Sequence, residues 1–188
     1  MMEDVHLNRD CYRILLQAMS RPGRVFRLQR EERRADFFPF LAIARCLLDQ
    51  EVSFCTVEGD AMDSAIIGVT GARAASLQEA DFIFTLGASG GAILQAKRGT
   101  PESPEQGATV ICCVKEKRVD PLERLSVCLA GPGIPAREGI VPEMGIALED
   151  MRALQAANAD YPMGVDTVFV RKDGRMMCIP RSCRIELR

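Results

Sequence analysis

The stretch that decides the fold of this chain lies near its end and reads Met163-Gly164-Val165-Asp166-Thr167-Val168-Phe169-Val170-Arg171-Lys172-Asp173-Gly174-Arg175-Met176-Met177-Cys178-Ile179-Pro180-Arg181. Two runs of β-branched and large apolar residues flank an Asp-Gly pair, which is the strongest short-range signal for a β-hairpin. A two-residue loop at Asp173 and Gly174 would fix the register of the two strands. It predicts four facing pairs: Lys172 with Arg175, Val170 with Met177, Val168 with Ile179, and Asp166 with Arg181.

Side chains alternate along each strand, so the hairpin has two faces, and both are mostly apolar. One predicted face carries Asp166, Val168, Val170, Met177, Ile179 and Arg181, and the other carries Val165, Thr167, Phe169, Met176, Cys178 and Pro180. Strands with two apolar faces are typical of a sheet that helices cover on both sides. We therefore expect the hairpin to lie inside an α/β sheet, with a carboxylate opposite a guanidinium at its end.

Length and composition indicate one soluble domain over residues 1–188. Hydrophobic residues make up 47% of the chain and charged residues 27%, which is ordinary for a globular protein. The net charge of −2 gives no electrostatic basis for binding nucleic acid or an anionic membrane. The chain has no apolar run long enough to span a membrane and no signal-peptide pattern, so we expect a cytoplasmic protein.

The eight cysteines are expected to be reduced thiols, most of them packed as small hydrophobic residues. No CxxC or CxxxC spacing occurs, and the only histidine, His6, lies in a polar N-terminal segment. The sequence therefore predicts neither a metal ion nor an iron–sulfur cluster.

The rest of the chain alternates between expected helices and strands. A helix capped by Asn8 and ending at Ser20-Arg21-Pro22-Gly23 precedes a strand at 25–28 and a charged connection at 29–36. Further helices are expected at 37–48, 59–67, 93–98 and 149–158, and further strands at 52–57, 80–86, 109–114, 125–129 and 140–141. Helices and strands alternate early and strands follow one another late, which predicts a mixed sheet with helices on both faces.

Three turns are weighed as binding elements. Gly87-Ala88-Ser89-Gly90-Gly91 sits where backbone amides hold phosphates, but it matches neither dinucleotide nor P-loop patterns, so a plain strand–helix turn is favoured. Ser20 has no base nearby, which favours a helix stop over a nucleophile. Gly131-Pro132-Gly133 is a rigid turn that brings backbone close either to a ligand or to a neighbouring loop.

The chain is poor in catalytic groups. It shows no triad, and no lysine stands at a strand end in an apolar setting, as Schiff-base chemistry requires. The Asp166–Arg181 pair remains, and an ion pair that only holds the structure explains it as well as a functional one does.

Four stretches together resemble the PhnH family of phosphonate-metabolism proteins. They are residues 12–23 (YRILLQAMSRPG), 104–111 (PEQGATVI), 129–134 (LAGPGI) and 161–187, with its YPMGVD and IPRS. Each is weak alone, but they occur in the family's order and cover essentially the whole chain. Residues 29–99 match less well, and the family often has Thr where this chain has Ser182.

The resemblance implies a three-layer αβα sandwich similar to the large domain of pyridoxal-phosphate transferases, without the cofactor lysine and without a cofactor. It also implies a homodimer that joins subunits G, I and J of the carbon–phosphorus lyase core complex. That complex transfers the triphosphoribosyl group of ATP to a phosphonate, and the PhnH protein is not expected to be catalytic alone. The alternative is an independent enzyme that acts on a nucleotide or a phosphonate.

Six residues are candidates for contact with a phosphorylated small molecule, either ATP or a phosphonate. Arg181 is predicted to bind the anion, and Asp166 to orient Arg181 or to contact a hydroxyl group. Gly131 and Gly133 would supply close backbone. Arg13 and Ser20 are lesser candidates.

Overall fold

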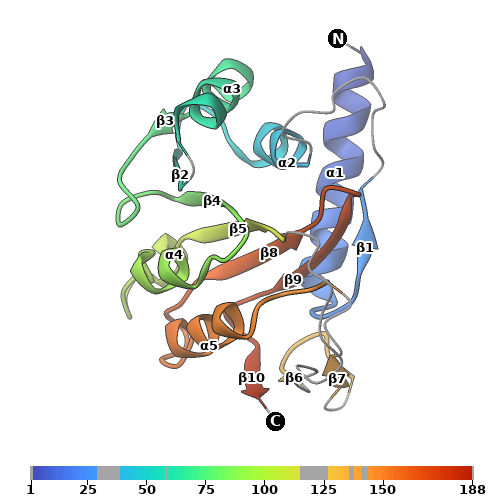
Figure 1. Ribbon diagram of the computed structural model, residues 1–188, viewed down its shortest axis with the longest axis vertical. Helices are drawn as coiled ribbons and strands as arrows, with labels where there is room; N and C mark the ends of the chain where they lie inside the picture. Colours follow the sequence, from blue (N-terminus) through green and yellow to red (C-terminus); the bar gives the residue numbers. More distant parts are fainter. Residues whose placement is uncertain are drawn as a thin grey trace.

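The computed structural model describes residues 2–28, 39–57, 59–114, 127–135, 138–140 and 144–187. These residues form a central sheet covered by helices and a second, smaller sheet beside it (Figure 1). The helices are α1 (Met2–Ser20), α2 (Phe40–Leu47), α3 (Asp60–Thr70), α4 (Gly90–Gln95) and α5 (Leu148–Ala157), with a 3-10 turn at Pro104–Gln106. Within the described residues, no helix has both the length and the apolar character needed to cross a bilayer.

The central sheet has seven strands in the order β1-β9-β8-β5-β4-β2-β3. Its strands are β1 (Phe26–Arg27), β2 (Ser53–Thr56), β3 (Arg73–Ala74), β4 (Phe82–Leu86), β5 (Thr109–Cys113), β8 (Asp166–Val170) and β9 (Arg175–Ile179). Neighbouring strands from β3 to β8 run parallel, whereas β9 and β1 are antiparallel additions at one edge. The sheet is therefore mixed, as predicted.

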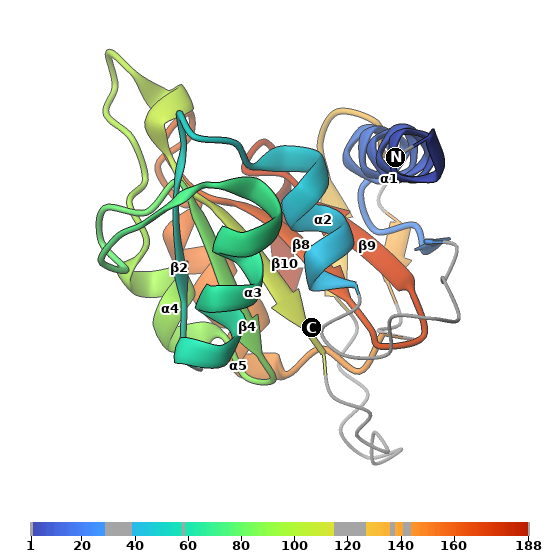
Figure 2. The ribbon, with the colours of Figure 1, turned by 90° about the horizontal axis from the view of Figure 1, so that it is seen from above.

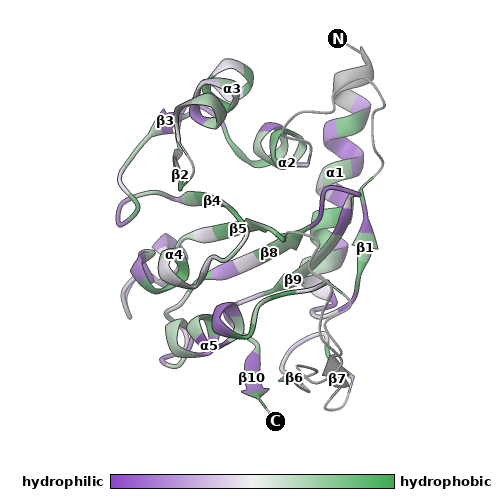
Figure 3. Cartoon of the chain, in the orientation of Figure 1, coloured by the Kyte–Doolittle hydropathy of each residue, from purple (hydrophilic) through white to green (hydrophobic). Residues whose placement is uncertain are grey.

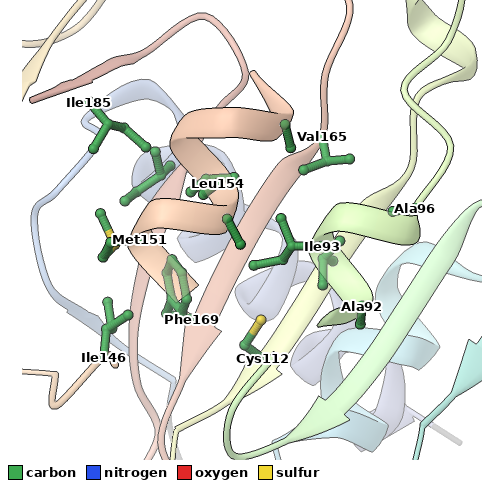
Figure 4. Close-up of a cluster of buried hydrophobic side chains, with 14 of the residues drawn as sticks. Ala92, Ile93, Ala96, Cys112, Ile146, Met151, Leu154, Val165, Phe169 and Ile185 are labelled. Carbon is green, nitrogen blue, oxygen red and sulfur yellow. The ribbon is translucent and has the colours of Figure 1, made fainter. Parts of the chain in front are cut away.

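Two hydrophobic clusters, one on each face of the sheet, hold the layers together. On one face α1, α2 and α3 pack through residues such as Leu15, Ile43 and Ile66. On the other face α4 and α5 pack through Ile93 and Leu154, as the close-up in Figure 4 shows. This arrangement of helix layer, sheet and helix layer confirms the α/β class and the coverage of both faces. The likeness to pyridoxal-phosphate transferases stays an expectation.

The second sheet is an addition that the sequence did not indicate. It has three antiparallel strands in the order β10-β6-β7, namely β6 (Val127–Ala130), β7 (Glu138–Ile140) and β10 (Arg184–Leu187). The strands expected at 125–129 and 140–141 overlap β6 and β7, which belong to this sheet, and residues 125, 126 and 141 lie outside the described residues. The last strand, β10, was not predicted, and neither was β3.

The hairpin exists as predicted, but its register differs by one residue. Its loop has three residues, because Arg171 N–H donates to the Arg175 carbonyl at 2.8 Å and Gly174 N–H donates to the Arg171 carbonyl at 2.9 Å. Gly174 adopts φ 84°, which is the left-handed residue of a three-residue hairpin loop. Asp173 accepts the Arg175 backbone N–H at 3.0 Å and pairs with the Arg175 side chain at 2.8 Å, which stabilises this turn.

The shift in register exchanges the two faces of β9. The observed pairs are Thr167 with Ile179, Val168 with Cys178, Phe169 with Met177, and Val170 with Met176. A slip of one residue moves every side chain of a strand to the other face. Met177 and Ile179 therefore pack under α5 with Phe169, and Met176 and Cys178 pack under α1. Both faces are buried, as expected for a strand pair inside an α/β sheet.

The ends of other elements also differ from the predictions. α1 begins at Met2, six residues before the expected cap Asn8, and it ends at Ser20 as predicted. α2 has Pro39 at its N-cap position and ends at Leu47, one residue before the expected end, and the expected start at 37 lies outside the described residues. The charged connection expected at 29–36 lies outside the described residues.

Candidate functional site

The predicted pair of Asp166 and Arg181 forms in the structure. Asp166 begins β8, and Arg181 follows β9 by two residues. The guanidinium donates to one carboxylate oxygen from Nη2 at 2.7 Å and from Nε at 3.1 Å, and the Arg181 backbone N–H donates to the other oxygen at 2.8 Å. The shifted register does not separate the two residues, because the Arg181 backbone and long side chain both reach back to the strand end.

Arg181 also fastens the hairpin to the turn before β5. Its Nη1 donates to the Pro104 carbonyl, and its Nη2 donates to the Gly107 carbonyl at 3.1 Å. A Cβ at Gly107 would overlap this guanidinium and the Gly164 carbonyl, so the turn needs glycine there. The Arg181 side chain is 14% exposed and that of Asp166 is 26% exposed. The pair is thus a nearly buried clamp with a clear structural role.

The turn that contains Gly131 and Gly133 closely approaches backbone of its own chain. Gly133 has φ 80°, and a Cβ there would overlap the carbonyl oxygen of Ser20 at the end of α1. Gly131 has φ 149°, and its Cβ would lie 2.9 Å from the Ser182 carbonyl oxygen. Both close approaches are to backbone of the same chain, at the end of α1 and at Ser182. This packing joins the end of α1 to the segment that follows Arg181.

Ser20 and Arg13 occupy exposed positions on α1. The Ser20 hydroxyl donates to the Gln17 carbonyl at 3.0 Å, which is a helix-end contact in agreement with the favoured helix stop. Arg13 is exposed about two turns earlier on the same helix. The structure therefore brings Ser20 to Gly133, but it does not bring Arg13 to Arg181.

A pocket of about 510 Å³ opens beside Arg181, between the end of α5 and the segment leading into β10. Its lining includes Tyr161, which is 66% exposed, together with Ser182 and the exposed Arg184. Gln155 closes one side by donating to the Ile185 carbonyl at 2.7 Å. The Glu186 carboxylate lines the same pocket. The pocket's guanidinium, hydroxyl and phenol groups are the ones that suit an anionic ligand that also carries a ring.

The two cysteines closest to Arg181 in the sequence, Cys178 and Cys183, are unsuited to nucleophilic catalysis. Burial and the nearby Asp166 carboxylate raise the pKa of Cys183 to about 11. Burial and the same carboxylate also raise the pKa of Cys178 above the usual thiol range. Since the thiolate is the reactive form, both cysteines stay protonated near neutral pH. The pocket can bind and orient a ligand, but the described side chains there show no activated nucleophile.

Sequence reasoning missed a buried polar contact that joins α4 to α5. Asp150 is only 3% exposed, and it accepts the backbone N–H of Ser89 at 2.7 Å. The Ser89 hydroxyl in turn accepts the Cys112 thiol at 3.1 Å. A signal existed, because Asp150 lies four residues before Leu154 on the apolar side of its helix. A carboxylate on such a stripe indicates a buried partner.

A second polar network lies at the start of β4. Asp81 pairs with Lys97 at 2.5 Å and accepts both the hydroxyl and the backbone N–H of Ser53, at 2.6 and 2.7 Å. Burial tends to raise the pKa of Asp81, but the hydrogen bonds from Lys97 and Ser53 outweigh it and lower the pKa below the ordinary value. Lys97 is thus held as an ion-pair partner.

The side chains that could bind a metal ion are dispersed over the described residues. No three histidine, cysteine or acidic side chains in that part of the chain lie close enough together to hold a metal ion. All eight cysteines are free thiols, and six of them are buried.

Comparisons with known proteins agree with the resemblance seen in the four motifs. The sequence model of a family described as "Bacterial phosphonate metabolism protein (PhnH)" matches residues 1–186. The protein HtxG of Stutzerimonas stutzeri, whose name provisionally assigns it as a C-P lyase subunit, is 32% identical over 181 residues. The alignment covers 94% of this chain and 85% of HtxG.

Proposed function

We propose that this chain, which belongs to the PhnH family of bacterial phosphonate metabolism proteins, is a subunit of a carbon–phosphorus lyase complex. The match over residues 1–186 carries this proposal, since it leaves almost no part of the chain unexplained. The name of HtxG points the same way.

The finer proposal concerns assembly and reaction. The chain would form a homodimer and would join subunits corresponding to G, I and J. The assembled complex would transfer the triphosphoribosyl group of ATP to a phosphonate, with release of adenine. The chain would act as an accessory subunit that is not catalytic alone.

The structure gives less support to an independent enzyme. Such an enzyme would use Asp166 as a general acid or base, and this requires a carboxylate free to exchange a proton with substrate. Asp166 instead accepts three hydrogen bonds from Arg181. A carboxylate bound in this way serves to position the arginine.

We keep the pocket beside Arg181 as the proposed site for a phosphate-bearing ligand. Arg181 has four of its five N–H groups engaged by Asp166, Pro104 and Gly107, so it has little capacity left for an anion. The exposed Arg184 in the same pocket is better placed to contribute most of the binding. Gly131, Gly133 and Ser20 would support this region through the packing of the turn on the end of α1.

Adenine release from ATP by the purified subunits tests the proposed function. Adding the chain to the other subunits, with a phosphonate present, should raise the rate of adenine release, and the chain alone should release none. Equal rates with and without the chain would contradict its role in the transfer step. Adenine release by the chain alone would instead favour the independent enzyme.

Substitutions in the pocket test the ligand site. Arg184→Ala should weaken binding of ATP or a phosphonate to the chain and leave the fold and the dimer intact. Arg181→Ala should weaken binding as well, but together with a loss of stability. Unchanged binding by both variants would remove the site from the proposal.

A further inference from the structure

The side of α1 that faces away from the sheet exposes two large hydrophobic side chains. Tyr12 and Leu16 lie one turn apart and are 49% and 51% exposed, whereas Leu15 and Ala18 on the opposite side are buried. Figures 1 and 2 show α1 at the border of the molecule, with one side toward the sheet and the other away from it. In Figure 3 the helix carries both apolar and polar patches along its length.

Guanidinium groups surround these two apolar side chains. Arg9 and Arg13 are exposed at helical spacing from Tyr12 and Leu16, so the four share one arc of the helix. Arg9 pairs with Asp10 at 3.0 Å, but both side chains are about half exposed, so this contact is weak and easily replaced. Tyrosine, leucine and arginine exposed together form the kind of cluster found at the centre of protein interfaces.

A hollow lies at the end of α1. It has a volume of about 450 Å³ and is lined by Arg21, Arg24, Gly133, Ile134 and Pro135. Its walls are apolar, with two exposed guanidinium groups at its border. A carboxylate side chain of a partner would find a charge-assisted donor in Arg21 there, and its methylene groups would contact Ile134 and Pro135.

The charge of this region is opposite to that of the rest of the chain. Residues 2–28, from the start of α1 to the end of β1 and Leu28, contain five arginines, one glutamate and two aspartates, a net charge of +2, in a chain whose net charge is −2. The remaining residues therefore carry −4. The five arginines are Arg9, Arg13, Arg21, Arg24 and Arg27, and all are exposed. A local positive field of this kind selects an acidic partner surface and speeds association with it.

We infer that the α1 face, defined as Arg9, Tyr12, Arg13 and Leu16 with the adjoining hollow, docks an acidic surface of another subunit of the complex. This inference rests on the proposed function and names the surface through which the chain would enter the assembly. A second copy of the chain fits less well, because a two-fold interface would set this basic patch against itself. Nucleic acid fits less well, because the molecule as a whole is acidic.

Binding of the full chain to a complex of the other subunits, measured by biolayer interferometry, tests this inference. The face variant combines Arg13→Glu with Leu16→Glu. The matched control combines Arg73→Glu on β3 with Ile67→Glu on α3, where Ile67 is 45% exposed. Urea unfolding of each variant checks the fold, and absorbance at 260 nm checks for bound nucleic acid.

If the α1 face is the docking surface, the face variant should bind the complex at least about tenfold more weakly than wild type. The control variant should bind within about twofold of wild type. Binding of the wild type should also weaken when salt rises from about 0.1 to 0.5 M. Equal binding by the face variant would overturn the inference and leave the proposed function intact. Loss of self-association, with binding to the complex unchanged, would assign the face to a second copy and would also overturn it. Release of bound nucleic acid by the face variant alone would overturn it in favour of that ligand. Failure of the wild type to bind would refute the proposed function itself.

Discussion

Replacement of Arg181 by methionine is the sharpest probe of the clamp at the end of the hairpin. Methionine keeps much of the apolar stem but removes the guanidinium and its four hydrogen bonds to Asp166, Pro104 and Gly107. Removal of one partner from a buried ion pair costs about 3–5 kcal/mol. Because the Asp166 side chain is 26% exposed, water restores part of that loss. We expect the free energy of unfolding to fall by about 3 kcal/mol.

Urea unfolding followed by circular dichroism measures this loss. Arg184→Met serves as the control, since Arg184 is exposed, and it should change stability by less than about 0.5 kcal/mol. A double-mutant cycle with Asp166→Asn should give a coupling energy of about 1–3 kcal/mol. Hydrogen exchange should also quicken in the turn at 104–107. If Arg181→Met unfolds within about 0.5 kcal/mol of wild type, the clamp does not hold the structure and the reasoning from its contacts is wrong.

Three further predictions concern separate parts of the chain. Gly133→Ala should destabilise the protein by about 2 kcal/mol or more, because Gly133 has φ 80° and a Cβ there would overlap the Ser20 carbonyl oxygen. Thermal melts should show that the control Gly68→Ala, which has open space around its Cβ, is neutral or stabilising. Cys46 should react with iodoacetamide before Cys55. The neighbouring Cys11 thiol on α1 lowers the pKa of Cys46 through a hydrogen bond, whereas burial raises the pKa of Cys55. Mass spectrometry of peptides after brief labelling at pH 8 shows the order of reaction. Asp81→Asn should destabilise the protein near pH 7, and this loss of stability should shrink below about pH 4. A carboxylate whose pKa is lowered in the folded state stabilises the fold above its unfolded pKa, and it stops doing so as it is protonated. Equal losses in urea unfolding at both pH values would contradict the assignment.

The hairpin illustrates how far the sequence determines this fold. The Asp-Gly signal located the turn, and two apolar faces correctly predicted a buried strand pair. The register failed because an Asp-Gly pair also fits a three-residue loop with glycine in the left-handed conformation. Which loop forms depends on Asp173, which holds the Arg175 backbone and side chain, and on Leu28, whose N–H donates to the Gly174 carbonyl at 2.8 Å. The Leu28 contact is tertiary and leaves no local pattern.

The candidate site was predictable only in its central pair. Asp166 and Arg181 could be paired from strand alternation, and a long arginine tolerates a slip of one residue. The contacts of Arg181 with the turn at 104–107 join segments more than seventy residues apart, so no local pattern indicates them. The pocket likewise depends on how α5 meets β10, and β10 itself was not predicted.

Size-exclusion chromatography with light scattering tests the central claim, membership in a carbon–phosphorus lyase complex, most directly. The chain of 20.7 kDa should elute alone as a dimer of about 41 kDa. After co-expression with the subunits corresponding to G, I and J, it should move into a larger species that contains all of them. A chain that keeps the same mass in the presence of those subunits would contradict the account.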